Sequence, residues 1–141
     1  MKLRRYWILG RRHFFLLCRA LCVVIYFRIA LCFVKYKRLS RSISVASEGD
    51  IPSEPSAGAI AWAVKNTSRI VPFATCLTQA LALQHMLGKR GEEAVIRIGV
   101  RTNGAGRIMA HAWVIFQGAI LIGGPQSNID RYTVMTDLKP G

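Results

Sequence analysis

Acidic residues are scarce in this chain: seven Asp and Glu stand against 20 Lys and Arg, which gives a formal net charge of +13. The imbalance is local, because residues 1–47 hold 11 of the basic residues and no acidic one. Hydrophobic residues make up 52% of the 141 positions. A chain this apolar is not a disordered polyelectrolyte. Its length and charge distribution indicate one domain preceded by a basic, apolar segment.

Metal-binding and disulfide patterns are also missing. Neither a CxxC nor an HxxxH motif occurs, so we expect no metal site, and nothing in the sequence calls for a cofactor. The cysteines do not show the short-loop spacing of a disulfide-rich secreted domain. Cys18, Cys22 and Cys32 lie in the apolar N-terminal segment, where we expect them to act as small apolar filling. Cys76 has a different setting.

A continuous transmembrane run is lacking as well. Arg19 and Arg28 interrupt the apolar stretch 14–34, and a central arginine costs about 2.5–3.5 kcal/mol on insertion scales. No secretory cleavage site follows the stretch. We therefore expect a cytoplasmic protein.

Residues 11–39 are predicted to form one or two helices with apolar residues at helical spacing. The residues of this apolar face are Phe14, Leu17, Cys18, Leu21, Val24 and Ile25. Three interpretations stay open: a helical layer packed on the rest of the domain, an interfacial helix on anionic lipid, or a docking surface for a partner protein.

A small-residue, acidic, Pro-containing stretch at 44–56 is typical of a linker and divides the segment 1–47 from a domain at 48–141. A helix should follow, with Ser56 near its cap. The clearest helix is predicted over residues 76–90. Thr75 suits its N-cap, and Gly91 stands where a left-handed terminator belongs.

Strand signals occupy the next part of the chain. Strands are predicted over residues 94–100, 108–116 and 119–122. A polar turn at 102–106 separates the first two, and Gln117–Gly118 is a two-residue hairpin candidate between the last two. A helix followed by an antiparallel sheet predicts an α+β fold.

Cys76 is a candidate nucleophile because of its place at the predicted helix start. A cysteine attacks as the thiolate, and free N–H groups and the dipole at a helix N-terminus stabilise that anion. Position alone does not decide the matter, since buried structural cysteines at helix starts are common.

His111 is the candidate base. It lies within a predicted strand between two alanines, and a nucleophile and its base commonly come from distant parts of a sequence. His85 is nine residues after Cys76 on the same predicted helix, so it should point roughly away from it. His13 lies in the basic segment and has no evident partner.

These residues carry a family resemblance. The segment at 75–91 (TCLTQALALQHMLGKRG), then IGV at 98–100, AHAWV at 110–114 and Gly118, resembles the B-type leader peptidases of lasso-peptide biosynthesis in their stand-alone form. Those enzymes are transglutaminase-like cysteine peptidases. The resemblance covers about residues 71–124 and implies a transglutaminase- or papain-like core, with the catalytic cysteine at a helix start packed on a small antiparallel sheet.

The resemblance also implies roles. Cys76 would attack the peptide carbonyl at the leader–core junction, and His111 would act as base and then as acid. We infer that the backbone N–H of Cys76 donates to the oxyanion. Such enzymes usually carry an acid on the strand after the histidine. If Phe116 pairs with Ala119, Gly124 would face His111, and it offers no side chain. Asp130 is the nearest downstream carboxylate and our candidate third member. Gln126 or a backbone carbonyl are the alternatives.

The implied function is removal of the leader from a ribosomally made precursor. Its implied partners are that precursor, a small leader-binding protein and a separate lasso cyclase. Another acyl-transfer activity on the same fold is the alternative enzyme. A non-catalytic basic binding module is the alternative of another class, but the basic residues lack the aromatic interleaving of a nucleic-acid reader, so we expect no nucleic-acid partner.

Overall fold

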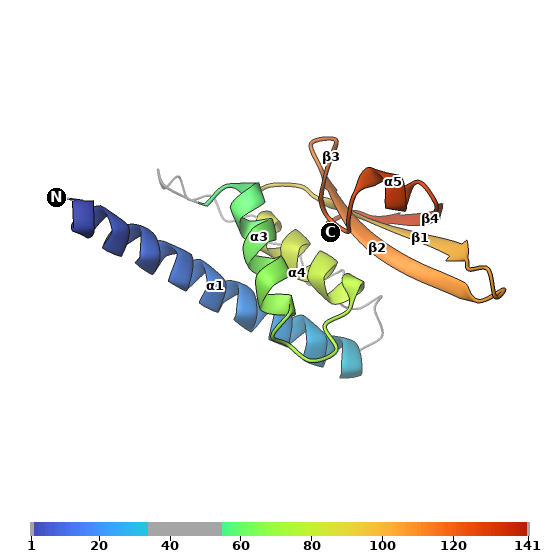
Figure 1. The fold of residues 1–141 in the computed structure, drawn as a ribbon, viewed down its shortest axis with the longest axis horizontal. Helices are drawn as coiled ribbons and strands as arrows, with labels where there is room; N and C mark the ends of the chain where they lie inside the picture. Colours follow the sequence, from blue (N-terminus) through green and yellow to red (C-terminus); the bar gives the residue numbers. More distant parts are fainter. Residues whose placement is uncertain (1, 34–54, 141) are drawn as a thin grey trace.

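One long helix, α1 (Lys2–Phe33), opens the fold in the computed structural model, which describes residues 2–33 and 55–140. Part of the predicted helical region, residues 34–39, and most of the predicted linker lie outside the described residues. α1 runs along the outside of the helices α3 (Ala57–Ser68) and α4 (Cys76–Gly88) and contacts both (Figure 1). This arrangement is the helical layer that one of the three interpretations expected.

The buried face of α1 differs from the predicted one. Phe14 and Ile25 are exposed, and so are Cys18, Cys22 and Cys32, so the prediction that these three cysteines fill an apolar core is wrong. Val24 is buried, as predicted, and the other buried residues of α1 are Leu16, Ala20 and Phe27. Because α1 is apolar on most sides, the periodicity of its apolar residues did not identify a single buried face. Packing against α3 and α4 determines which face is buried.

The outer side of α1 leaves large apolar side chains in contact with solvent: Phe14, Phe15, Tyr26, Ile29 and Phe33. By length and composition, the segment Gly10–Phe33 could cross a membrane, since it contains an 18-residue window with a mean hydropathy of 2.2. A core helix of a soluble protein meets the same test. Contact of this side with lipid or with a partner protein therefore stays a proposal.

The two shorter helices begin at capping side chains, as the sequence predicted. Ser56 accepts a hydrogen bond from the backbone N–H of Ala59 at the start of α3. Thr75 accepts one from the backbone N–H of Thr78 at 3.3 Å, which satisfies a donor that the first turn of α4 would otherwise leave free. α4 ends two residues before the predicted boundary, and Gly91 has the left-handed φ of 72° expected of a terminator.

α4 is the central helix of the core. Ala80, Leu81 and Leu87 are fully buried between α1, α3 and the sheet. Gln84 is also buried, and its side-chain amide donates to the carbonyls of Ala94 (2.8 Å) and Leu138 (2.9 Å). These two bonds satisfy a polar group that would be costly to bury unpaired, and they fix α4 against the ends of two strands.

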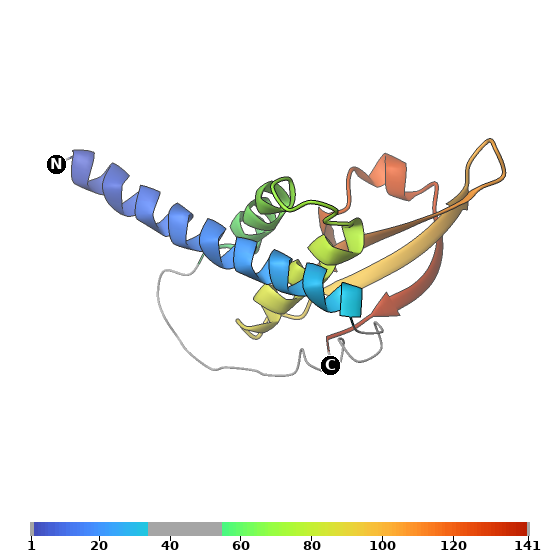
Figure 2. The same cartoon turned by 90° about the horizontal axis from the view of Figure 1, so that it is seen from below.

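The sheet has four antiparallel strands in the order β3-β2-β1-β4 (Figures 1 and 2). β1 (Val95–Thr102), β2 (Ile108–Phe116) and β3 (Ala119–Ile122) match the three predicted strands, and the α+β prediction is confirmed. The short helix α5 (Gln126–Ile129) and the edge strand β4 (Thr133–Leu138) were not predicted.

The two faces of the sheet have different neighbours. Ala112 and Val114 of β2 belong to the hydrophobic core shared with the helices. Side chains alternate along a strand, so His111 and Trp113 lie on the opposite face. There their rings contact each other and the ring of Tyr132.

The β2–β3 hairpin has the predicted two-residue turn, in which Gln117 and Gly118 both have positive φ. Phe116 pairs with Ala119, also as predicted. A register shift then follows between Val114 and Ile115, so that Val114 pairs with Ile122, where β3 ends. The predicted pairing of His111 with Gly124 is therefore wrong, because it assumed a regular ladder.

Candidate active site

Cys76 is the first residue of α4 and is half-buried, with its side chain packed at the margin of the hydrophobic core. The Thr75 cap fixes the backbone at this point. The backbone N–H groups of a first helical turn have no carbonyl partner within the helix. The sulfur is thus held where a negative charge is favoured, and nearby N–H donors can face a developing oxyanion.

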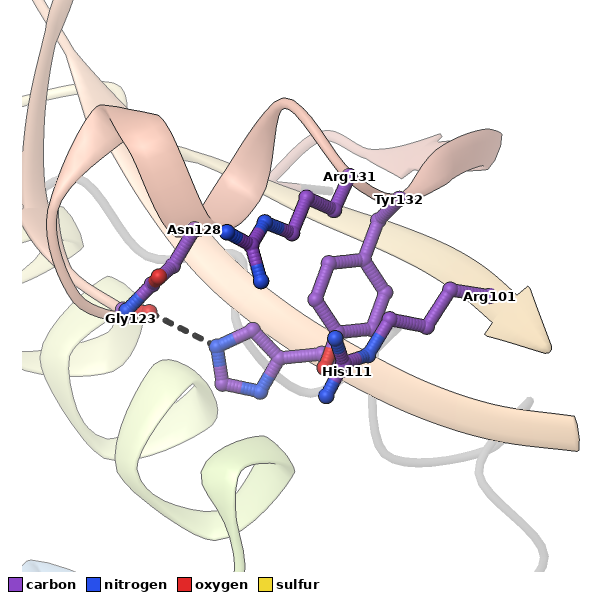
Figure 3. Close-up of a pocket in the computed structure, with 6 residues that line it drawn as sticks. All are labelled: Arg101, His111, Gly123, Asn128, Arg131 and Tyr132. Atoms are coloured by element: carbon purple, nitrogen blue, oxygen red, sulfur yellow. Dashed lines mark hydrogen bonds between the residues drawn. The ribbon is translucent and has the colours of Figure 1, made fainter. Parts of the chain in front are cut away.

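His111 is positioned by a hydrogen bond that the sequence left open. Its Nε2 lies 2.7 Å from the carbonyl oxygen of Gly123, at the end of the β2–β3 hairpin (Figure 3). A carbonyl can only accept, so Nε2 carries the proton. In the neutral imidazole, Nδ1 is then left with a free lone pair. This is the tautomer that a general base acting through Nδ1 requires.

Gly123 can reach the imidazole because it is glycine. Its φ is 127°, in a region that other residues rarely adopt. A Cβ at this position would lie 2.2 Å from Cβ of Trp113. Gly124, with a φ of 100°, would have no atom within 4 Å of an added Cβ. The close contact of Gly123 with Trp113 thus places its carbonyl beside the histidine that precedes that tryptophan by two residues.

Asp130 occupies a different position. It caps the C-terminal end of α5, and its carboxylate accepts a hydrogen bond from the side-chain amide of Gln126 at 2.7 Å. No hydrogen bond joins Asp130, or the alternative candidate Gln126, to His111, although all three lie in the described part of the chain. Of the three options that the sequence offered for orienting His111, the backbone carbonyl is the one in contact.

Replacement of Asp130 by asparagine should therefore have a small effect on catalysis. Asparagine can still accept from Gln126, and the bond between His111 and Gly123 does not involve position 130. We expect single-turnover cleavage to change less than about threefold, under 1 kcal/mol at the transition state. A hundredfold loss with unchanged substrate binding would instead make Asp130 the residue that orients the imidazole.

Cys76 and His111 are not joined by a hydrogen bond in this structure, and Cys76 does not line the cavity beside His111. Both residues lie in the described ranges. α4 packs against β2 on the face of Ala112 and Val114, whereas His111 projects from the other face of that strand. Hydrogen bonds between catalytic groups are often long without substrate, so the dyad is a proposal that kinetics must test.

His85, the histidine of α4, lies on the side of the helix that faces α1. Its ring is 5.5 Å from that of Phe27, centroid to centroid. Burial lowers its pKa below the usual value, and the positive charges of Lys89 and Arg19 lower it further. This position matches the expectation that His85 points away from the start of α4.

The lowered pKa of His85 predicts that acid weakens the packing of α1. The unfolded chain binds this proton near pH 6.5 and the folded chain only at lower pH. Between those two values the unfolded state holds more protons, so stability falls as the pH decreases. Melting temperatures measured from about pH 8 to about pH 5 should fall less for His85→Gln than for the unmodified protein. The exposed His13 provides a control, because His13→Gln should follow the unmodified curve. Parallel curves for all three proteins would contradict the prediction.

A cavity of about 320 Å³ opens beside His111 (Figure 3). Its lining comes from β1, β2, the end of the hairpin and the segment around α5: Arg101, His111, Gly123, Asn128, Arg131 and Tyr132. Sequence reasoning assigned no role to the two arginines. Alternation along the first strand could have placed Arg101 on the face of His111, but Arg131 follows a helix that was not predicted. Among the described residues, no group of three or more His, Cys, Asp or Glu could hold a metal ion.

The family model described as the transglutaminase-like superfamily matches residues 21–137. The match begins inside α1 and includes Cys76, His111 and the sheet up to the next-to-last residue of β4. No curated protein and no solved structure matched the chain.

Proposed function

This chain belongs to the transglutaminase-like superfamily, and we propose that it is a cysteine peptidase with Cys76 as nucleophile and His111 as base. The superfamily includes cysteine peptidases and acyltransferases, and both begin with attack of a thiolate on a carbonyl carbon. The observation that carries the assignment of the base is the bond from His111 to the Gly123 carbonyl. It commits Nε2 as donor and leaves Nδ1 to accept the proton of the thiol.

In the proposed reaction, His111 takes the Cys76 proton, and the thiolate attacks the carbonyl carbon of the peptide bond. The resulting oxyanion accepts from N–H groups at the start of α4. The imidazolium then gives its proton to the leaving nitrogen, and the carbon–nitrogen bond breaks. Water attacks the thioester with His111 as base, the carbon–sulfur bond breaks, and the carboxylic acid leaves. The thiolate and imidazolium that remain return to the starting state by proton transfer.

In this proposal the Gly123 carbonyl performs part of the role of the carboxylate in a catalytic triad. It fixes the tautomer and the ring orientation of His111, which are the geometric tasks of a third member. It carries a partial charge only, so it stabilises the imidazolium less than a carboxylate would. We therefore propose a catalytic dyad in which the backbone carbonyl of Gly123 orients the imidazole. The N-terminus of α4 then supplies a larger share of the electrostatic stabilisation, by favouring the thiolate and the oxyanion.

The finer assignment is leader removal in lasso-peptide maturation. It rests on the sequence resemblance at residues 75–91, 98–100 and 110–114 and at Gly118. Its proposed partners are the precursor, a small leader-binding protein and a lasso cyclase.

The test is an in vitro reaction with a lasso-peptide precursor and a leader-binding protein. We expect a product cut at one bond and bearing a free carboxyl group, and none with Cys76→Ala. Addition of a primary amine separates the two enzyme classes. An acyltransferase would form the amide as its main product, whereas a peptidase would still give the acid. Cleavage that persisted in the folded Cys76→Ala variant would overturn the proposal.

A further inference from the structure

The cavity beside His111 is cationic. Among the described residues, its only charged side chains apart from the titratable histidine are Arg101 and Arg131, and no acidic one lines it (Figure 3). At about 320 Å³ it is at the small end of the range of ~300–1,000 Å³ that ligand sites occupy. It therefore suits one or two side chains of a bound peptide.

Neither arginine is neutralised within the described part of the chain. The nearby carboxylates are engaged elsewhere, since Asp137 pairs with Arg97 and Asp130 accepts from Gln126. Nε of Arg101 is buried and has no hydrogen-bond partner among the described residues. A buried N–H donor without a partner is uncommon and costly, so it is a place where a ligand acceptor would be favoured.

The cavity also holds Arg101 in place before any ligand binds. The guanidinium carbon of Arg101 lies 5.1 Å from the centroid of the Tyr132 ring, which is a cation–π contact. A guanidinium fixed on an aromatic face loses less freedom when it forms a paired hydrogen bond to a carboxylate. In Figure 3 the guanidinium group of Arg131 lies above the His111 ring, and that of Arg101 lies on the side of the ring away from Gly123.

We propose that this cavity is a specificity subsite for the side-chain carboxylate of an Asp or Glu near the scissile bond, bound by Arg101 and Arg131. The inference rests on the proposed peptidase function, because it takes the neighbouring His111 as part of the reaction centre. Asn128 and Tyr132 supply further polar groups at the same opening.

Binding is tested on full-length Cys76→Ala by following the Nε–H signals of Arg101 and Arg131 in NMR spectra. The probes are N-acetylglutamate N-methylamide, its glutamine counterpart, and N-acetylglutamine with a free terminal carboxylate. We expect saturable shifts with the first probe alone. Equal responses to the glutamate and glutamine probes, or no response, would overturn the proposal. A stronger response to the terminal carboxylate would overturn its assignment to a side chain.

Specificity is tested on the active protein with precursor peptides that carry Glu or Gln at each of three positions on either side of the cleaved bond. We expect kcat/KM for the best Glu peptide to exceed that of its Gln counterpart by about tenfold or more, the size of a lost charge-assisted hydrogen bond. Arg101→Gln and Arg131→Gln should reduce this ratio to under about threefold by acting on the Glu peptide alone. Arg107→Gln, in the exposed β1–β2 turn, is the matched control and should keep the ratio.

The two proposals can fail separately. Cleavage that depends on Cys76 but is indifferent to Glu and Gln at every position would overturn the subsite and leave the peptidase standing. Carboxylate binding at the two arginines, without cleavage of any peptide, would support the subsite and count against the peptidase.

Discussion

His111→Ala should reduce precursor cleavage by at least about a thousandfold, or ~4 kcal/mol at the transition state. Without the imidazole, no group accepts the thiol proton and none protonates the leaving amine. Nucleophile and base act as a unit, so the loss should be close to that of Cys76→Ala, and the double variant should be little worse than either alone.

The measurement is single-turnover kinetics at saturating precursor and leader-binding protein, which separates chemistry from binding. His85→Ala is the matched control, because His85 is a histidine of α4 that contacts Phe27 of α1 and not the proposed site. We expect it to retain activity within a few-fold. Added imidazole should partly restore His111→Ala, since the deletion enlarges an existing cavity. Loss of activity in a folded His85 variant, with His111→Ala active, would reverse the assignment.

Gly123→Ala should be strongly destabilising. The added Cβ would lie 2.2 Å from Cβ and 2.9 Å from Cα of Trp113, so the flexible end of a side chain cannot relieve the contact. Overpacking of this kind costs about 1–3 kcal/mol or more, and the φ of 127° adds about 1–3 kcal/mol for a residue with a Cβ. A loss of at least about 3 kcal/mol should lower the melting temperature by roughly 10 °C.

The variant Gly124→Ala separates the cost of the steric contact from the cost of the backbone strain. It also has a positive φ, but nothing lies within 4 Å of its added Cβ, so only the backbone strain of ~1–2 kcal/mol applies. Thermal unfolding of both variants measures the difference, and equal melting temperatures would show that the Trp113 contact is not rigid. Any Gly123→Ala protein that folds should also lose activity, because its carbonyl holds the imidazole of His111.

Local sequence signals were enough to place the helix α4 and three of the four strands of the sheet. Thr75 and Gly91 marked the ends of one helical region, and Gln117–Gly118 marked the hairpin, because capping and turn geometry depend on a few adjacent residues. The same signals proposed Cys76 at a helix start and His111 within a strand. α5 and β4 were missed: β4 is an exposed edge strand without a clear apolar alternation.

The sequence by itself determined the α+β class, the helix that begins at Cys76 and the strand that carries His111, since these depend on contacts between near neighbours. Only the tertiary structure decided which face of α1 is buried, because that helix is apolar on several sides and its partners select the face. It also decided what orients His111. One register shift in the β2–β3 ladder and the contact of Gly123 with Trp113 bring a backbone carbonyl to the ring. A backbone carbonyl is present at every residue, so no residue type could have marked it in advance.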